Sequence, residues 1–373
     1  MPAVYNLSKE LAKMGHKVIV YTTDALKAKD RIRQAEEVID GIEVRRFKNL
    51  SNTMAYNHNI FLSPGIILGV RKGLKNFDII HMHEYRTIQN IIVHRYAMKY
   101  GIPYVIQAHG SLPRVMAKKR LKQLYDNLWG YKLLRDALRV IALTETEAEQ
   151  YKSMGVSPDK IEIVPNGIDL AEFENLPERG EFRREYGLGS DQRIILYLGR
   201  IHKIKGLDLL VKAFADLSKP LNDIKLVIVG PDDGYLPSLK KLTADLEISD
   251  KVLFTGPLYG QEKLKAYVDA DVYVLPSVYE TFPVAVLEAC ACGTPIILTD
   301  RCGIADVIEG QAGLVVPYDR EQLQHALLHM LDDDKMRLRF GERGKSLVRE
   351  RFTWGSITEQ VISIYESCMS SKY

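Results

Sequence analysis

Two glutamates, Glu280 and Glu288, bracket the part of this chain whose residue types best fit ligand chemistry. Between them, Pro283 suits the first turn of a helix, and Gly293 suits its end. The predicted helix is apolar on almost every side, so we expect it to be buried with Glu288 inside it. A buried carboxylate is costly unless a polar group meets it. This position therefore predicts either a ligand contact or a polar partner within the protein.

The start of the same helix offers a place for an anion. The free amides of Val284 and Ala285 favour a negative group. Glu280 precedes them and Glu288 follows them, which suits a ligand with phosphates at one point and hydroxyls on both sides, such as a nucleotide sugar. A buried helix with one tolerated glutamate is the alternative that this segment leaves open.

Length and composition indicate two domains and no strongly charged partner. A chain of 373 residues is too long for one ordinary domain, and its 46% hydrophobic residues allow full cores. The net charge of +3 does not call for nucleic acid. The four cysteines include no CxxC pair, so we expect reduced thiols in a cytosolic protein. No apolar run reaches the ~18 residues of a membrane span, and we expect no signal peptide because the chain starts with an amphipathic segment.

Short runs rich in Val, Ile and Leu alternate with helical stretches along the whole chain. Such runs are typical of a parallel sheet covered on both faces, and their repetition predicts an α/β protein with two doubly wound domains. The boundary falls in the polar stretch 169–191, which separates a domain at 1–170 from one at 171–351. The predicted strands cover residues 17–22, 42–47, 78–83, 104–109, 140–144, 161–165, 194–199, 225–230, 252–255, 272–276, 295–298 and 313–316.

The first predicted element is an amphipathic helix at residues 3–14. A doubly wound domain normally starts with a strand in mid-sheet, followed by a Gly-rich turn. We therefore expect either a natural protein with roughly 15–25 further residues upstream or a domain with a gap at the centre of its sheet. We favour the longer protein.

Two cations, Arg200 and Lys205, follow the predicted strand 194–199. They lie at the carboxyl edge of the sheet, where open α/β sheets bind ligands, and together they can neutralise a diphosphate. Loop cations are more often simply solvated, so the pair alone is a weak signal. Gly230 ends the next strand and allows close backbone approach. We expect the helices near 207–213 and 262–267 to cover the sheet without chemistry.

An ordered set of motifs carries a resemblance over nearly the whole chain. The second half has GRxxxxKG at 199–206, the VGPD and FTGPL turns, ADVYVLPS at 270–277 and the two glutamates with seven residues between them. The first half adds GHKV at 15–18, DIIHMH at 78–83, AHGSLP at 108–113 and VPNGID at 164–169. No single motif is decisive, but the set resembles the retaining glycosyltransferases of family 4.

The resemblance implies the GT-B fold, in which two Rossmann-like domains face each other across a cleft and a C-terminal helix, here 352–373, packs back on the first domain. The family's first strand and Gly-Gly loop have no counterpart in this chain. The resemblance also implies catalytic roles for His109, Glu280, Arg200 and Lys205. The donor-binding set is Arg200, Lys205, Gly230, Leu258, Glu280, Phe282, Pro283, Val284, Ala285 and Glu288.

Within that set the resemblance gives each part of the donor its own contacts. Arg200 and Lys205 would hold the diphosphate, and Glu288 would bind the ribose hydroxyls. Glu280 would bind hydroxyls of the transferred sugar, and Leu258 would meet the base. Residues 282–285 would present backbone to sugar and phosphate. His109 would lie near the anomeric centre. Metal and cofactor are not implied, because the nucleotide sugar is a substrate and the protein's own cations can supply the charge.

Three histidines of the first half, His81, His83 and His109, are candidates for a functional site. His109 ends a strand beside a glycine, which fits either a place over a ligand or a strand cap. His81 and His83 alternate on a strand and face the same side. No third ligand of suitable spacing follows them, so we expect no metal. His83 and Arg114 are instead predicted on the acceptor side.

Residues 111–139 hold the one strong charge asymmetry, with eight basic residues against two acidic ones. Large apolar residues are interleaved with the charges. A basic amphipathic segment can lie on an anionic membrane, or it can be a solvated face beside a core stripe. The basic residues are Arg114, Lys118, Lys119, Arg120, Lys122, Lys132, Arg135 and Arg139, and the apolar ones are Val115, Met116, Leu121, Leu124, Tyr125, Leu128, Trp129 and Tyr131.

We therefore predict a metal-independent hexosyltransferase that moves a sugar from a UDP- or GDP-sugar to a glycan, lipid-linked or small-molecule acceptor, with retention at the anomeric carbon. It would serve polysaccharide or glycolipid synthesis in the cytoplasm, where the basic segment allows peripheral binding to the inner face of the membrane. Two alternatives stay open. One is a sugar-nucleotide epimerase of the same fold, although no acid–base set for it is found. The other is a catalytically impaired protein that binds nucleotide sugar.

Overall fold

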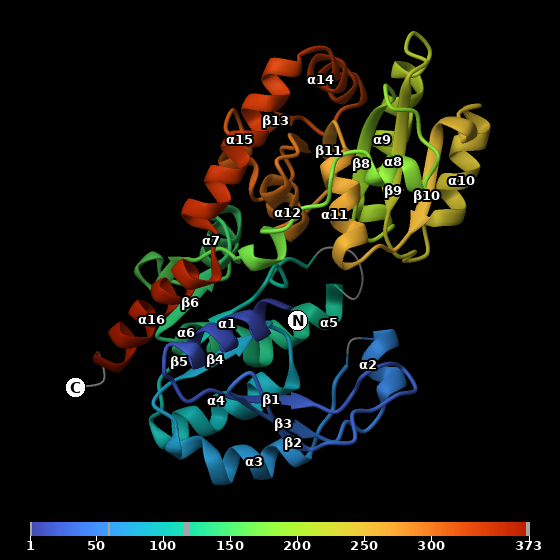
Figure 1. Cartoon of the computed structure of the whole chain (residues 1–373). Coiled ribbons are helices and arrows are strands. Elements are labelled where there is room, and N and C mark those ends of the chain that lie inside the picture. Colours follow the sequence, from blue (N-terminus) through green and yellow to red (C-terminus); the bar gives the residue numbers. More distant parts are fainter. Residues whose placement is uncertain (1, 59, 115–118, 371–373) are drawn as a thin grey trace. The chain divides into compact units, whose positions relative to one another are not determined.

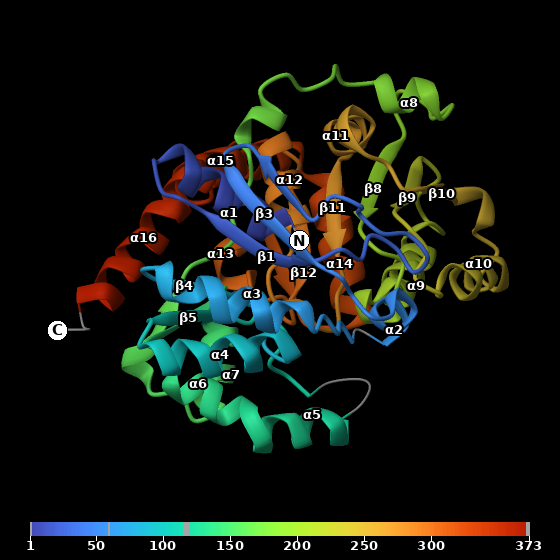
Figure 2. The same cartoon turned by 90° about the horizontal axis from the view of Figure 1, so that it is seen from below.

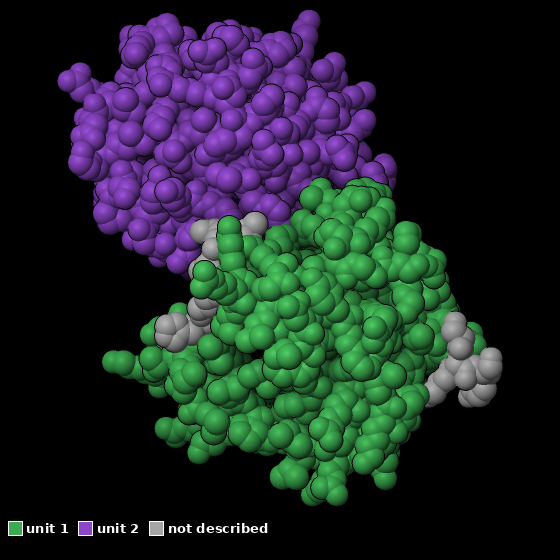
Figure 3. Space-filling model, turned by 180° about the vertical axis from the view of Figure 1, so that it is seen from behind, with its two compact units in different colours: residues 1–166, 354–373 green, residues 167–353 purple. Residues whose placement is uncertain are grey.

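The computed structural model describes residues 2–58, 60–114 and 119–370, and it divides into two compact units. The first unit comprises residues 1–166 and 354–373, and the second comprises residues 167–353 (Figure 3). The two ends of the second unit meet, because the amide of Ile168 donates to the carbonyl of Phe352 at 2.8 Å. Each unit is an α/β structure with its own core (Figure 1).

The second unit is built on one six-stranded sheet in the order β10-β9-β8-β11-β12-β13, with every neighbouring pair parallel. The strand order reverses between β8 and β11, which is the topological switch point where doubly wound sheets bind ligands. All six predicted strands of this half are present, within one residue at each end. The strands are β8 (Arg193–Leu198), β9 (Ile224–Val229), β10 (Val252–Gly256), β11 (Val272–Leu275), β12 (Ile296–Thr299) and β13 (Gly313–Val316).

Helices cover both faces of this sheet (Figure 2). The strand interiors are almost wholly buried, as their uninterrupted apolar runs predict. The α-helices are α8 (Glu181–Glu185), α9 (Leu207–Leu217), α10 (Leu236–Asp245), α11 (Gly260–Asp269), α12 (Val284–Cys292), α13 (Ala305–Ile308), α14 (Arg320–Asp332) and α15 (Asp334–Arg351). Single 3₁₀ turns are η4 (Leu170–Phe173), η5 (Lys203–Lys205) and η6 (Ser249–Lys251).

The first unit has two sheets rather than one. A parallel sheet has the order β4-β5-β6-β7, and a second sheet has the order β1-β3-β2. Within the described residues no strand joins β1 to β4, which is the divided sheet expected of a chain that starts with a helix. The strands are β1 (Ile19–Thr23), β2 (Glu36–Ile39), β3 (Ile42–Phe47), β4 (Ile80–His83), β5 (Tyr104–Gln107), β6 (Arg139–Ala142) and β7 (Ile161–Ile163).

One strand of this unit, β2, was not predicted. β2 pairs antiparallel with β3 at the edge of the small sheet. It escaped prediction because it begins with two glutamates and alternates between exposed and half-buried residues, unlike a strand covered on both faces. The tight turn through Asp40 and Gly41, both with positive φ, connects the two strands.

The C-terminal helix α16 (Trp354–Ser370) belongs to the first unit and packs beside α1 (Pro2–Lys13). Trp354, Ile357, Val361 and Ile364 share a core with Leu7 and Leu11 of α1. The other helices of this unit are α2 (Asn52–His58), α3 (Gly65–Gly73), α4 (Ile88–Tyr100), α5 (Lys119–Tyr125), α6 (Tyr131–Asp136) and α7 (Glu145–Ser153), with the 3₁₀ turns η1 (Leu74–Asn76) and η3 (Pro158–Lys160) and the π-helical turn η2 (Asp126–Gly130).

Candidate active site

Helix α12 begins one residue later than predicted, with Pro283 just before its first turn, and it ends as predicted at Gly293, which has φ +77°. The amide of Val286 donates to the carbonyl of Pro283 at 3.0 Å. No hydrogen bond from the amides of Val284 or Ala285 is found among the described residues. The first turn of α12 therefore keeps two N–H groups for an acceptor from outside the helix.

Glu288 lies in the middle of α12 and has polar partners within the protein. Lys263 donates to one of its carboxylate oxygens at 2.8 Å, and the hydroxyl of Tyr267 donates to the other at 3.1 Å. Both partners come from α11, so this helix also positions a candidate site residue, which the sequence did not predict. Burial, followed by the charge of Glu288, raises the pKa of Tyr267 well above its ordinary value, and the hydroxyl stays protonated as a donor. Glu288 is thus held in place before any ligand arrives.

Lys205 and Glu280 meet at the switch point between β8 and β11. Lys205 ends the turn η5 after β8 and forms an ion pair with Glu280, which lies in the loop between β11 and α12. The backbone of Glu280 is anchored as well, because its amide donates to the carbonyl of Arg301 at 3.2 Å. The structure therefore brings together two of the residues predicted to hold the donor.

Two glycines let the loops of this site approach each other. Gly206, at φ +65°, follows Lys205, and a Cβ atom there would lie 1.9 Å from the carbonyl oxygen of Pro276. Gly230 has φ +146°, and a Cβ atom there would lie 1.8 Å from the carbonyl oxygen of Gly199. Both positions accept only glycine. The close approach that the sequence predicted at Gly230 is made to backbone of the neighbouring strand end.

Arg200 differs from Lys205 in its surroundings. Its side chain is 63% exposed and forms an ion pair with Asp233 at 2.9 Å, whereas the side chain of Lys205 is 14% exposed. Leu258 is half-buried in the loop after β10, and Phe282 is buried with its ring 6.1 Å from that of Phe352. Of the predicted donor-binding side chains, Lys205 and Glu280 thus form a largely buried pair, whereas Arg200 is exposed.

In the first unit, His83 and His109 are in direct contact. Nδ1 of His83 lies 2.9 Å from Nε2 of His109, and the ring of His81 stacks on that of His83 with 4.0 Å between centroids. His81 and His83 therefore face the same side of β4, as their spacing predicts. Burial lowers the pKa of His109 to about 4 and that of His83 well below its ordinary value, so both rings are neutral near pH 7.

Arg114 contacts protein rather than open space. Its Nε donates to Asp126 at 2.8 Å, and the same carboxylate accepts two bonds from Arg86 at 2.8 and 2.9 Å. Asp126 is fully buried in η2, and Arg114 also donates to the hydroxyl of Tyr131 at 2.7 Å. A role of Arg114 on the acceptor side stays a prediction, and its visible role is to balance a buried charge.

Sequence reasoning missed several of these partners. Glu147 accepts the amides of Leu143 at 2.8 Å and of Gly110 at 2.5 Å, and so fixes the turn that carries His109. The T-x-x-E spacing from Thr144 was a readable signal, since it marks a helix start. Lys263 and Tyr267 stand four residues apart on one face of α11. Nothing in the sequence, however, says which helix that face meets.

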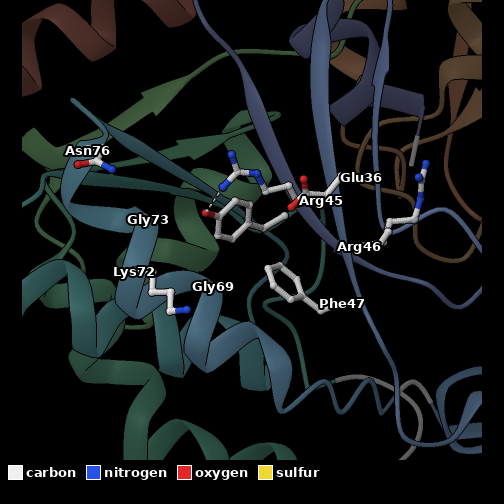
Figure 4. Close-up of a pocket in the computed structure, with 10 residues that line it drawn as sticks. Glu36, Arg45, Arg46, Phe47, Gly69, Lys72, Gly73 and Asn76 are labelled. Atoms are coloured by element: carbon white, nitrogen blue, oxygen red, sulfur yellow. Dashed lines mark hydrogen bonds between the residues drawn. The ribbon is translucent and has the colours of Figure 1, made fainter.

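A cavity of about 400 Å³ lies in the first unit between α3 and the small sheet (Figure 4). It is lined in part by Phe47, Lys72, Arg45 and Arg46. Each of the two arginines is paired with a glutamate of the small sheet, Glu43 or Glu37. The cavity is separate from the residues considered above.

The fold, the strand order and the polar groups at the switch point define a doubly wound ligand-binding protein, and comparisons with known proteins identify its family. Residues 3–172 match the family model described as Glycosyltransferase Family 4, and residues 178–347 match the model described as Glycosyl transferases group 1. The chain belongs to this family of GT-B glycosyltransferases and is a glycosyltransferase of the group 1 type.

Three similar proteins illustrate the relationship. The D-inositol 3-phosphate glycosyltransferase of Pseudarthrobacter chlorophenolicus is 30% identical over 308 residues, which are 79% of this chain and 71% of that protein. Sucrose-phosphate synthase from Thermosynechococcus elongatus has a similar structure, with a TM-score of 0.80, 22% identity and coverage of 99% and 93% of the two chains. Anabaena HepE in complex with UDP has a TM-score of 0.79, 16% identity and coverage of 98% and 95%.

Proposed function

We propose that this enzyme transfers a hexose from a nucleoside diphosphate sugar, with UDP as the favoured nucleotide, to an acceptor with retention at the anomeric carbon. The observation that carries the proposal is the convergence of Lys205, Glu280 and the first turn of α12 at the switch point of the second unit. A cation and free amides suit a diphosphate, and carboxylates on either side suit hydroxyls. The complex of the structurally similar HepE with UDP supports this choice of nucleotide.

The chemistry needs charge stabilisation and positioning more than a strong nucleophile. When the bond between the anomeric carbon and the diphosphate breaks, negative charge grows on the leaving phosphate. Lys205, Arg200 and the α12 amides are the groups that would stabilise that charge. In the retaining mechanism that the family resemblance implies, the leaving phosphate itself accepts the proton of the acceptor on the same face. We propose that the reaction needs no metal ion, since these groups supply the positive charge.

Glu288 would bind the ribose hydroxyls of the donor. Lys263 and Tyr267 hold its carboxylate at 2.8 and 3.1 Å, which leaves further lone pairs on both oxygens. Hydroxyl groups donate to such oxygens without displacing the partners. The amide of Leu258 and its neighbours after β10 would meet the base.

The experiment that tests this proposal is titration calorimetry with UDP, GDP and ADP, followed by turnover assays with the matching glucose and mannose donors. We expect UDP to bind, binding to persist in EDTA, and the anomeric configuration of the donor to be kept in the product when it is read by NMR. Absence of binding by all three nucleotides would contradict the donor site. A product of opposite configuration would contradict retention alone.

We further propose that α5 and the turns after it bind an anionic membrane surface beside the acceptor. Leu121, Leu124, Leu128 and Trp129 are all exposed, at 44–54%, rather than packed as a core stripe. Lys119 and Arg120 are exposed next to them. An exposed apolar row flanked by cations is the pattern of helices that lie in a lipid interface. Val115, Met116 and Lys118, which belong to the same predicted segment, lie outside the described residues.

Within residues 2–58, 60–114 and 119–370, no helix has both the length and the apolar character that a membrane span requires. Association through α5 would place a lipid-linked or phosphorylated acceptor near the first unit. A glycan or small-molecule acceptor is the alternative, and it would gain support if the protein did not bind anionic vesicles.

A further inference from the structure

Three histidines of the first unit form a connected row that runs from helix α16 to the turn after β5. The hydroxyl of Tyr365, on α16, lies 2.7 Å from Nδ1 of His81. The ring of His81 stacks on that of His83, and Nδ1 of His83 lies 2.9 Å from Nε2 of His109. The family resemblance implies a role for His109 at the donor sugar, but it implies no role for the hydrogen bond between His83 and His109.

The contact with His83 decides which nitrogen of His109 is left for a ligand. Nε2 of His109 is occupied by His83. Nδ1 has no hydrogen-bond partner among the described residues, and it is not one of their fully buried unpaired polar atoms. Nδ1 is therefore the nitrogen of His109 that is left for a contact from outside the described residues. Its hydrogen, or lack of one, sets whether His109 donates or accepts there.

The backbone around His109 leaves the ring little freedom. His109 and Gly110 have φ values of +50° and +80°, so two consecutive residues are in the left-handed region. The buried carboxylate of Glu147 holds this turn by accepting the amide of Gly110 at 2.5 Å. With the main chain fixed by α7, the contact to His83 is what sets the direction of the imidazole.

Because His83 and His109 share one hydrogen bond, the position of the hydrogen on one ring depends on its position on the other. Burial lowers the pKa of His109 to about 4, and burial together with the neighbouring histidines lowers that of His83 well below its ordinary value. Two neutral imidazoles in one hydrogen bond must differ, since one offers N–H and the other a lone pair. Among the described residues, the titratable groups near this row include His81, which stacks on His83, Tyr365, which contacts His81, Glu84, which follows His83, and Glu147, which accepts the amide of Gly110.

We propose that His83 is a positioning residue that donates its Nδ1–H to Nε2 of His109 and thereby holds His109 in the tautomer with hydrogen on Nδ1. In that form His109 presents an N–H donor to the substrate. A substrate oxygen without a hydrogen can only accept a hydrogen bond, so the opposite tautomer would turn a lone pair toward it. The proposal rests on the proposed donor chemistry for its purpose, whereas the tautomer itself is a property of the free protein.

The experiment combines a tautomer measurement with kinetics. Protein labelled with ¹⁵N in its nine histidine rings is examined without ligand by two-bond proton–nitrogen correlation, and the His109 signals are assigned by their loss in His109→Gln. We expect hydrogen on Nδ1 and a bare Nε2. His83→Phe keeps an aromatic ring against His81 but has no Nδ1, so His109 should change tautomer, and kcat should fall about tenfold or more.

His83→Asn is the matched control, because its amide nitrogen takes the place of Nδ1 and can donate to His109. We expect this variant to restore the wild-type tautomer and most of kcat. A wild-type His109 with hydrogen on Nε2, or an unchanged tautomer in His83→Phe, would overturn the proposal. Failure of the wild type to bind UDP would instead overturn the proposed donor site, and the ligand-free spectra would still decide the role of His83.

Discussion

Lys205 and Glu280 form an ion pair across the switch point of the second unit, although the family roles assign one to the diphosphate and the other to the transferred sugar. Both side chains are largely buried, at 14% and 19% exposure. The pair holds two groups of the proposed donor site in place in the free protein. Preorganisation of this kind reduces what must be ordered when the donor binds.

Removal of the Lys205 charge should weaken nucleotide binding. We expect Lys205→Met to lose about 1.5–3 kcal/mol of UDP binding free energy, because a charge-assisted contact in a partly buried site is lost. Titration calorimetry measures it. Lys203→Met is the matched control, since Lys203 lies in the same turn, is exposed, and has no ion pair among the described residues. Equal losses in both variants would mean that only the general positive charge of the turn matters.

The two glutamates should differ in what they affect. Glu280→Gln should mainly reduce kcat, because the proposed partner is on the sugar that is transferred. Glu288→Gln should raise the donor KM and weaken bare UDP, because the proposed partner is ribose. Calorimetry with UDP alone separates them. A larger loss of UDP affinity in Glu280→Gln than in Glu288→Gln would show the roles to be reversed.

Local sequence pattern was enough to find the strands and the start of α12. Pro283 and Gly293 bound that helix as their conformational preferences require, and the apolar runs of the second half are strands. The edge strand β2 was missed because it begins with two glutamates, one exposed and one half-buried, which removes the apolar run on which the prediction relied. The sequence pattern therefore located strands that are buried on both faces and overlooked a strand that is covered on one face.

Side-chain partners are set by tertiary adjacency, which a single sequence does not display. Glu288 was expected to need a polar partner, yet Lys263 and Tyr267 became visible only when α11 was seen beside α12. Likewise, His83 was predicted on the acceptor side, but its hydrogen bond to His109 depends on the register between β4 and β5. The sequence thus indicated the groups, and the fold decides which of them meet.

Membrane binding by α5 should respond to charge and to apolar contact in different ways. We expect sedimentation with anionic phosphatidylglycerol vesicles at low salt and its decrease as salt screens the cations. Lys119→Gln with Arg120→Gln should lose about 1 kcal/mol for each charge. Leu121→Ser with Leu124→Ser should weaken binding at every salt concentration.

The control for these variants is a pair of exposed lysines on the second unit. Lys240→Gln with Lys241→Gln changes the net charge by the same amount on α10. Vesicle binding should not change in this protein. If the control loses as much as the α5 variant, attraction depends on net charge and not on α5. If wild type does not sediment at all, the segment is a solvated face and a lipid-linked acceptor loses its support.

Asp126 should be a major determinant of the stability of the first unit. It is fully buried and accepts hydrogen bonds from Arg86 and Arg114. Asp126→Asn should lower the free energy of unfolding by about 3–5 kcal/mol, because a buried guanidinium keeps its charge and loses its partner. The measurement is urea unfolding followed by tryptophan fluorescence, since both tryptophans, Trp129 and Trp354, belong to this unit. Asp159→Asn, in an exposed turn, should change little.

The histidine row should make the first unit sensitive to acid. Burial lowers the pKa of His81 to about 3 and that of His109 to about 4, below the ordinary 6.5 of the unfolded chain. Between these pKa values, the rings therefore bind protons in the unfolded chain and stay neutral in the folded protein. The stability that comes from neutral rings is complete above pH 6.5 and is lost as the pH falls from 6.5 toward 4. Each ring contributes a slope of about 1.4 kcal/mol per pH unit in that range.

His81→Phe isolates one of these protons. Between pH 6 and 4.5, its free energy of unfolding should fall less steeply than that of wild type, by about 1.4 kcal/mol per pH unit. The carboxylates that titrate in the same range are common to both proteins, so the difference between the two curves reports the buried ring. His16→Phe, at an exposed position of the same unit, should parallel wild type. Parallel curves for His81→Phe and wild type would show that the His81 ring takes up its proton in the folded protein.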